Sequence, residues 1–377
     1  MASISKRILE SGKPQWRVSY VDAQGRRKRP GFSTWREADS FRQDIEEKLR
    51  KGTYRANADS LTINEVCDAY LGYCLGRMER NERMTQKMYV VYRGHVNNHI
   101  LGSGAGLAGR KLSQVTPAVV VEFRDALRTN GVSISTTRKI IATLHSALEF
   151  AISRDWIAMN AAHGVRVIGS RGEGPKQITP PDKEDLKKIL ERADFSLRLK
   201  IMFAALTGLR ASEQWGLKWK DVDLGDGTIH VRRRIDSYGN EGSTKSKAGV
   251  RDIPISRALI SLLKEHILSS PYKGEEDFVF ANSKGRQVSH DNLIKRHFKP
   301  LLAEIDVEEL VWHSLRHFAV STWIEQGLSA KSVQTYAGHS SLSVTMDRYG
   351  HMFPNEEHKA RMDAIAGEIL GLPQKRT

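Results

Sequence analysis

The chain has 377 residues, a formal net charge of +15 and a pI near 9.7. Such a length predicts two or three domains. The basic excess favours nucleic acid as a partner over a merely soluble basic protein. The sequence lacks a long apolar run and an N-terminal secretory pattern, which argues against a membrane or exported protein. Two cysteines, Cys67 and Cys74, without a second pair at zinc spacing, predict reduced thiols and a cytoplasmic location.

Residues 1–57 predict a small basic domain, a three-stranded sheet with one helix. The stretch QWRVSY alternates apolar and polar residues, DAQG offers a turn, and apolar residues from Trp35 to Leu49 follow helical spacing. Residues 1–55 contain 14 Lys/Arg and 7 Asp/Glu, a net +7. The hairpin tip is the basic run Arg26, Arg27, Lys28 and Arg29. This run is either a solvated turn or part of a sheet that lies in a DNA groove.

Residues 60–168 predict a helical domain. Thr62 with Glu65 forms a capping-box pattern, and a second helix is predicted between Pro117 and Gly131. A long amphipathic helix after residue 133 carries Arg138 and Lys139, which we expect to contact DNA. The polar, Gly- and Pro-rich residues 169–181 predict an interdomain linker.

Residues 182–354 predict a mixed domain that is mainly helical. Two β-rich runs, residues 227–236 and 249–255, flank GNEGSTKSKAG and predict one two- or three-stranded sheet. In residues 355–377, Asn355 would cap an amphipathic tail helix. This tail packs either on its own domain or on a neighbouring protomer. The whole chain is therefore predicted to be mainly α with small β-sheets.

Four short motifs follow one another in the last domain. They are TGLR ending at Arg210, the run that begins with Lys245, HSLR from His313 to Arg316, and GHSSLSVTMDRY from Gly338 to Tyr349. Each motif is weak alone, because basic chains contain such fragments by chance. Their order and spacing together are far more specific.

These residue types suit cleavage of a phosphodiester. Arg210 and Arg316 can each donate two parallel hydrogen bonds to phosphate oxygens and stabilise the charge of the transition state. A lysine, Lys245 or alternatively Lys247, can protonate the leaving 5′ oxygen. Tyr349 is then either the nucleophile or a core ring whose hydroxyl reaches the surface. Since no acidic cluster accompanies these motifs, we expect neither a metal nor a cofactor.

In this order of motifs the sequence resembles the tyrosine recombinases, or phage-type integrases, over roughly its last half. The resemblance implies that His313 assists proton transfer, that His339 donates to a nonbridging phosphate oxygen, and that Glu213 orients the site from behind. It favours Lys245 over Lys247, and His317 and His351 are set aside as uninvolved. By layout, residues 1–57 resemble an arm-type DNA-binding domain, 60–168 a helical, SAM-like core-binding domain and 182–354 a catalytic domain.

The function implied is site-specific recombination through a 3′-phosphotyrosyl intermediate, integrating or excising a phage or integrative element. Double-stranded DNA is the expected partner, both at a crossover site and at flanking arm sites. Four copies would assemble on it at the bacterial nucleoid, with an excision or bending factor as a candidate partner. The alternatives are a type IB topoisomerase and a non-catalytic DNA-binding regulator.

Overall fold

The structure, a computed structural model, describes residues 2–22, 25–102, 104, 106–169, 173, 180–244, 247–307, 310–353, 362, 365–366 and 368–369. The chain divides into two compact units, Met1–Gly174 and Pro175–Thr377, and each is described by itself. In the described ranges, every helix is too short or too polar to cross a lipid bilayer. Most of the predicted tail helix in 355–377 lies outside the described residues.

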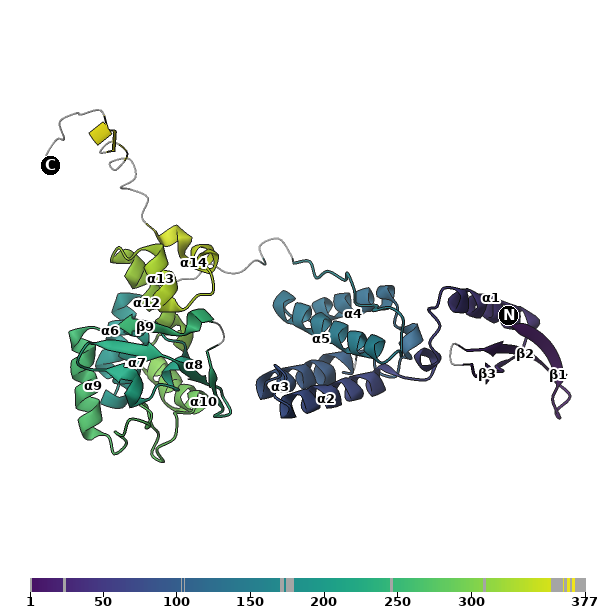
Figure 1. Ribbon diagram of the computed structural model, residues 1–377, viewed down its shortest axis with the longest axis horizontal. Helices are drawn as coiled ribbons and strands as arrows, with labels where there is room; N and C mark the ends of the chain where they lie inside the picture. The colour runs from purple at the N-terminus through teal and green to yellow at the C-terminus, as the bar shows by residue number, and fades with distance from the viewer. Residues whose placement is uncertain are drawn as a thin grey trace. The chain divides into compact units, whose positions relative to one another are not determined.

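The first unit begins with an antiparallel sheet and one helix (Figure 1). Its elements are β1 (Ser3–Ile8), β2 (Pro14–Val21), β3 (Arg27–Lys28), β4 (Gly31–Phe32) and α1 (Trp35–Arg50). Both β3 and β4 pair with β2, so the predicted third strand is present but interrupted between them. Helix α1 begins at a Thr34–Glu37 capping box and packs on one face of the sheet, where Val18 and Tyr20 are buried.

The rest of this unit is helical, as predicted. It comprises η1 (Ala56–Asp59), α2 (Ile63–Glu79), α3 (Gln86–His95), the π-helical turn η2 (Val96–Ile100), η3 (Leu112–Gln114), α4 (Pro117–Thr129) and α5 (Ile134–Ser153). Thr62 caps α2 and Pro117 starts α4, which confirms the capping patterns read from the sequence. The apolar stripe of α5 faces α2 and α4, and both cysteines are buried, unpaired, in α2.

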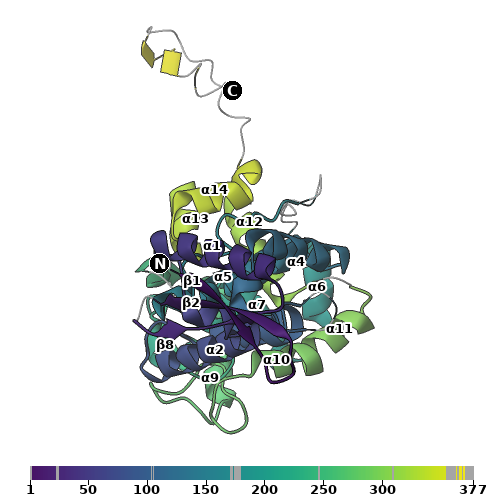
Figure 2. The same cartoon turned by 90° about the vertical axis from the view of Figure 1, so that its right-hand side faces the viewer.

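The second unit surrounds two small sheets with helices (Figures 1 and 2). Its helices are α6 (Lys183–Arg192), α7 (Phe195–Thr207), α8 (Ala211–Gln214), η4 (Trp219–Asp221), η5 (Lys247–Gly249), α9 (Arg257–Ser269), α10 (His290–Leu293), η6 (Ile294–Phe298), α11 (Lys299–Glu304), α12 (Trp312–Glu325), α13 (Ala330–Ala337), α14 (Leu342–Tyr349) and η7 (Gly350–Met352). Its strands are β5 (Val222–Asp223), β6 (Thr228–Val231), β7 (Arg233–Ile235), β8 (Glu241–Ser243) and β9 (Arg251–Pro254).

One sheet has the order β5-β6-β9, and β7 pairs with β8 in a separate hairpin. The single β-rich run predicted over residues 227–236 is thus divided between two sheets at Arg232. After β8 the chain returns to β9 through residues 244–250, which include Lys245.

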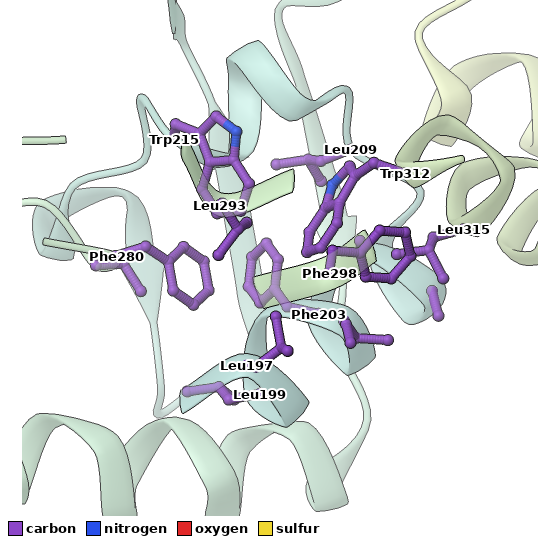
Figure 3. Packing of buried hydrophobic residues seen from close by; sticks show 14 of the residues in the cluster. Leu197, Leu199, Phe203, Leu209, Trp215, Phe280, Leu293, Phe298, Trp312 and Leu315 are labelled. Atoms are coloured by element: carbon purple, nitrogen blue, oxygen red, sulfur yellow. The ribbon is translucent and has the colours of Figure 1, made fainter. Parts of the chain in front are cut away.

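A core of aromatic side chains supports the second unit (Figure 3). Phe203 meets Phe280 edge-on with ring centroids 5.0 Å apart, and Phe298 meets Trp312 in the same way at 5.1 Å. Burial of one such ring contributes roughly 1.5–3 kcal/mol. This core fixes α7, which ends at the first residue of TGLR, and α12, whose first turns contain HSLR.

Candidate active site

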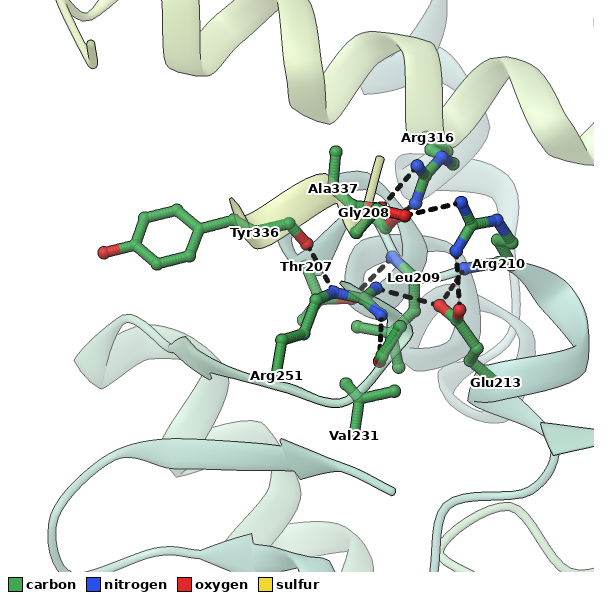
Figure 4. A network of polar contacts seen from close by, with 12 residues as sticks. Thr207, Gly208, Leu209, Arg210, Glu213, Val231, Arg251, Arg316, Tyr336 and Ala337 are labelled. Carbon is green, nitrogen blue, oxygen red and sulfur yellow. Dashed lines mark hydrogen bonds and ion pairs between the residues drawn. The ribbon is translucent and has the colours of Figure 1, made fainter. Parts of the chain in front are cut away.

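Three arginines converge on the C-terminal end of α13 (Figure 4). Arg251 donates from Nε to the carbonyl oxygen of Tyr336 at 2.7 Å, Arg316 from Nη2 to that of Ala337 at 2.5 Å, and Arg210 from Nη2 to that of Gly338 at 2.9 Å. The last carbonyls of a helix lack partners within the helix and carry partial negative charge. Three consecutive carbonyls therefore each receive a different guanidinium. We call Arg210, Arg251 and Arg316 the arginine cage.

Two left-handed glycines make these approaches geometrically feasible. Gly208 (φ +60°) ends α7, and its carbonyl accepts a second bond from Arg316 Nη1 at 2.6 Å. Gly338 (φ +65°) ends α13, and a Cβ there would lie 2.9 Å from Arg251 Nη1. Any other residue at 338 would be strained in this backbone conformation and would crowd the guanidinium. The glycine of GHS thus leaves room for Arg251 against the backbone, whereas a Cβ at the glycine of TGLR would meet Trp323.

Glu213 joins two members of the cage. Its Oε1 accepts from Arg210 Nη1 at 2.7 Å and its Oε2 from Arg251 Nη2 at 2.8 Å. Burial alone would raise the pKa of this carboxyl, but Arg251 and then Arg210 outweigh it and hold the pKa at about 2. Glu213 is therefore ionised at neutral pH and holds Arg210 from its buried side.

The two predicted clamp arginines differ in exposure. The side chain of Arg210 is 32% exposed, whereas Arg316 is only 3% exposed. Burial, followed by the charge of Arg210, lowers the pKa of Arg316 to about 9. The guanidinium of Arg316 therefore remains charged at neutral pH. Arg210 is thus the accessible donor, and Arg316 adds positive charge from beneath it.

His339 directly follows Gly338, the residue whose carbonyl accepts from Arg210, and its side chain is buried. Its Nδ1 lies 2.9 Å from the Thr345 hydroxyl, and its Nε2 is buried without a hydrogen-bond partner within the described ranges. Burial and the charges of Arg316 and Arg210 lower the pKa of His339 to about 3, so the ring is neutral at pH 7. If Thr345 donates to Nδ1, the ring proton sits on Nε2, which can then donate to a phosphate oxygen.

Tyr349 is the largest fully buried side chain of the described residues, with 0% of its surface exposed. It ends α14 and packs in a cluster with Val320, Val333 and Ala337. Its hydroxyl is hydrogen-bonded to Nδ1 of His317, a residue that the sequence analysis set aside. Burial raises the pKa of Tyr349, although Arg316 and Arg348 oppose this effect. The side chain must leave this position before its oxygen can reach a phosphorus atom.

His313 and His317 lie one helical turn apart on α12, with ring centroids 4.7 Å apart and the rings edge to face. Desolvation lowers the pKa of each ring to about 4; for His313 the charge of Arg316 adds next, and for His317 the charge of His313. Both are neutral at pH 7 and can accept a proton. In this conformation His317 is hydrogen-bonded to the Tyr349 hydroxyl, while the ring of His313 packs on that of His317.

The remaining predicted residues fall in three places. Lys245 lies outside the described residues, and for Lys247 the structure gives only the backbone, at the start of η5. Arg138 and Lys139 are both exposed on α5, where Arg138 donates to the Val167 carbonyl. The four basic residues of the N-terminal tip, Arg26 to Arg29, are exposed at the end of β2 and along β3.

The sequence analysis did not single out Arg251, His317 and Arg348 among the functional residues. Arg251 lies two residues after the stretch GNEGSTKSKAG, and His317 directly follows HSLR, so both are adjacent to quoted motifs. What the sequence lacked was the fold of β9 onto α13 and of α14 onto α12, which brings these side chains to the others. Contacts between segments so distant in the chain leave no periodic signal.

Comparison with known proteins places these features in context. The phage integrase family matches residues 176–356 of the chain. The XerC-like tyrosine recombinase of Caldanaerobacter subterraneus subsp. tengcongensis is 28% identical, over 93% of this chain and 96% of that protein. The ICEBs1 integrase of Bacillus subtilis is 25% identical, over 94% and 97%. The solved Tn1549 transposon integrase, in complex with a circular intermediate DNA, is 20% identical over 80% of this chain and 99% of its own, with a TM-score of 0.63.

Proposed function

Because the chain belongs to the phage integrase family of tyrosine recombinases, we propose that it is a site-specific DNA recombinase that integrates or excises a mobile element. The observation that carries this proposal is the arginine cage next to a tyrosine and three neutral histidines. The cage gathers fixed positive charge without a metal ion, and phosphoryl transfer needs such charge at the transition state.

The proposed reaction has two balanced steps. The Tyr349 oxygen attacks the scissile phosphorus and forms a 3′-phosphotyrosyl bond, its proton passing to a neutral histidine, His313 by the resemblance. The P–O bond to the 5′ oxygen breaks, and Lys245 protonates that oxygen. The 5′-hydroxyl of the partner strand then attacks the phosphorus of the phosphotyrosyl bond and passes its proton back to Lys245. The P–O bond to Tyr349 breaks, and the tyrosine oxygen regains its proton from the histidine. The ester keeps the energy of the broken bond, so rejoining needs no ATP.

The geometry supports distinct roles for the other residues. Arg210 offers accessible donors to the phosphate, and Arg316 adds buried charge below it. The unpartnered Nε2 of His339 suits a nonbridging oxygen. Glu213 keeps Arg210 in place rather than meeting DNA, since it is buried and bonded to two guanidinium groups.

Tyr349 is retracted in the conformation described, and we propose that assembly on DNA releases it. Two duplexes have four strands to cut, so four protomers would act together, in the cytoplasm at the nucleoid. Contacts between protomers are then available to move α14 and its tail. Cleavage would be confined in this way to the assembled complex.

The domain assignments remain part of the proposal. Residues 60–168 and 182–354 would bind the crossover site, with Arg138 and Lys139 contacting it. Residues 1–57 would bind flanking arm sites, and one chain that holds two sites raises the local concentration of each. An excision or bending factor would then set the direction of the reaction.

The N-terminal sheet has a second face that suits this arm-binding role. Residues directly opposite one another in the strand register share a face, so Ser5 lies beside Arg17 and Arg7 beside Gln15, while Arg27 lies opposite Val21. This open face is polar and basic, and α1 covers the other one. A sheet of this width enters the major groove of DNA. Arg27 shares the open face, whereas Lys28, opposite Tyr20, belongs to the face of α1.

The experiment that tests the proposed function is a covalent trap. Suicide duplexes are built from the DNA that flanks the gene, with nicks that let the cleaved strand diffuse away. We expect a covalent protein–DNA complex with one of these duplexes only. A trap on every duplex would indicate a topoisomerase, and no trap on any duplex would indicate a non-catalytic regulator.

A second experiment separates the arm domain from the rest. A chain that starts at residue 59 should still be trapped on the crossover duplex but should fail to integrate a site that carries flanking repeats. A second variant is the full chain with Arg7 and Arg17 both changed to Gln. It should also be trapped on the crossover duplex and fail to integrate the site that carries flanking repeats. Full integration by the truncated chain would contradict the arm-binding assignment.

A further inference from the structure

Arg251 is a buried arginine at the start of β9 to which the proposed chemistry gives no role. It is 5% exposed, and each of its three nitrogens bonds to a different segment of the chain. Nε donates to the Tyr336 carbonyl at 2.7 Å, Nη1 to the Gly249 carbonyl at 2.9 Å and Nη2 to Glu213 Oε2 at 2.8 Å. One planar group thus joins the end of α13, the end of η5 and the start of α8 (Figure 4).

The bond to Gly249 reaches the segment that carries the candidate acid. We call residues 244–250 the lysine loop; they connect β8 to β9 and include Lys245 and Lys247. Gly249 closes η5, and a Cβ at this position would lie 2.5 Å from the Thr244 Cβ, so the two ends of the loop are packed together. The carbonyl that Arg251 holds is therefore at the closed base of the loop, two residues from Lys247.

The other two bonds of Arg251 anchor it to the parts of the site that hold phosphate. Glu213 binds Arg210 with its other oxygen, and the Tyr336 carbonyl precedes the carbonyls that hold Arg316 and Arg210. A planar guanidinium with three fixed bonds cannot tilt without breaking at least one of them. The distance from the base of the lysine loop to Arg210 is consequently set through Arg251.

We propose that Arg251 is a positioning residue that sets the lysine loop, and with it the proton donor to the leaving 5′ oxygen, against Arg210 and the phosphate. This inference rests on the proposed recombinase function. Arg251 itself does not touch DNA, because its guanidinium is buried and occupied. Substitution of Arg251 by lysine should misplace the proton donor while the positive charge of the site is kept.

The test compares two scissile linkages in the same protein preparation. The duplex selected by the covalent trap is made with an ordinary 5′ oxygen or with a 5′-bridging sulfur, which leaves as a thiolate without protonation. The ratio of the sulfur rate to the oxygen rate is then measured for each variant. Any unfolded fraction lowers both rates equally, so it cancels in this ratio.

For Arg251→Lys we expect cleavage of the oxygen linkage to fall about 10–100-fold, as small misplacements of catalytic groups do, while the ratio rises about 10-fold or more. Arg251→Gln should raise the ratio at least as much. The matched control is Arg198→Lys, another partly buried arginine that donates to a carbonyl, that of Ala193, away from the cage. Its ratio should equal that of the wild type.

An Arg251→Lys variant that loses both rates equally, or that cleaves like the wild type, overturns the inference and leaves the recombinase function intact. A wild-type chain that cleaves neither linkage overturns the recombinase function itself. The two failures are therefore distinguishable.

Discussion

The arginine cage and Tyr349, the proposed nucleophile, stand side by side in the same unit, yet they are held in opposite ways. Every member of the cage has at least two bonds to backbone carbonyls or to Glu213. Tyr349 is held by apolar packing and one hydrogen bond to His317, at the end of an eight-residue helix.

In the proposed chemistry, this difference separates a preorganised part, the cage, from a gated part, Tyr349. Fixed donors cost no reorganisation when charge develops on the phosphate, so the cage is effective as soon as DNA binds. A nucleophile that is free at all times would cut DNA before a partner duplex is in place. In the proposed chemistry, retention of Tyr349 in this buried apolar cluster would therefore separate binding from cutting.

The largest expected effect comes from the cage. Arg316→Lys and Arg210→Lys keep the charge but lose the planar fork, and we expect strand cleavage to fall by about 10³–10⁵-fold. Affinity for the crossover duplex should change by only a few fold. Covalent-complex formation and gel shift on the same duplex measure the two effects. Equal losses in both would mean that the arginines position DNA and do not stabilise the transition state.

A smaller effect is expected from the lysine loop. Lys245→Ala removes the proposed proton donor, which should slow cleavage by about 10²–10⁴-fold. A 5′-bridging sulfur should restore most of the rate, whereas it should not rescue Arg210→Lys. Lys247→Ala is the matched control, with a modest and unrescued loss. Rescue of Lys247→Ala alone would transfer the role to Lys247.

The smallest expected effect is at the contact that holds the tyrosine. His317→Phe keeps a ring but removes the acceptor, so cleavage should stay within about 10-fold of the wild type while the buried Tyr349 hydroxyl is left unpaired. That hydroxyl should cost the free protein about 1–3 kcal/mol in urea unfolding. The cost should disappear when Tyr349→Phe is combined with it. A loss of cleavage as large as that of the arginines would make His317 part of the chemistry.

The sequence was informative where the candidate residues stand in short local motifs. Arg210, Arg316 and His339 could be chosen from short motifs, and the structure brings them together around one helix end. The capping box at Thr62 was equally local. The pairing of Tyr349 with His317, and the three bonds of Arg251, could not be predicted, because they depend on how α14 packs on α12 and β9 on α13. The division of the β-rich run at Arg232 was missed for the same reason, since alternation alone does not show which strand a segment pairs with.

The most direct test of the account identifies the residue that becomes attached to DNA. The trapped complex is digested, and the peptide that carries the nucleotide is sequenced by mass spectrometry. The account predicts a phosphotyrosyl bond at Tyr349, no adduct from Tyr349→Phe at unchanged duplex affinity, and a normal adduct from Tyr336→Phe, whose ring points away from the cage (Figure 4). An adduct on another residue, or one formed by Tyr349→Phe, would contradict it.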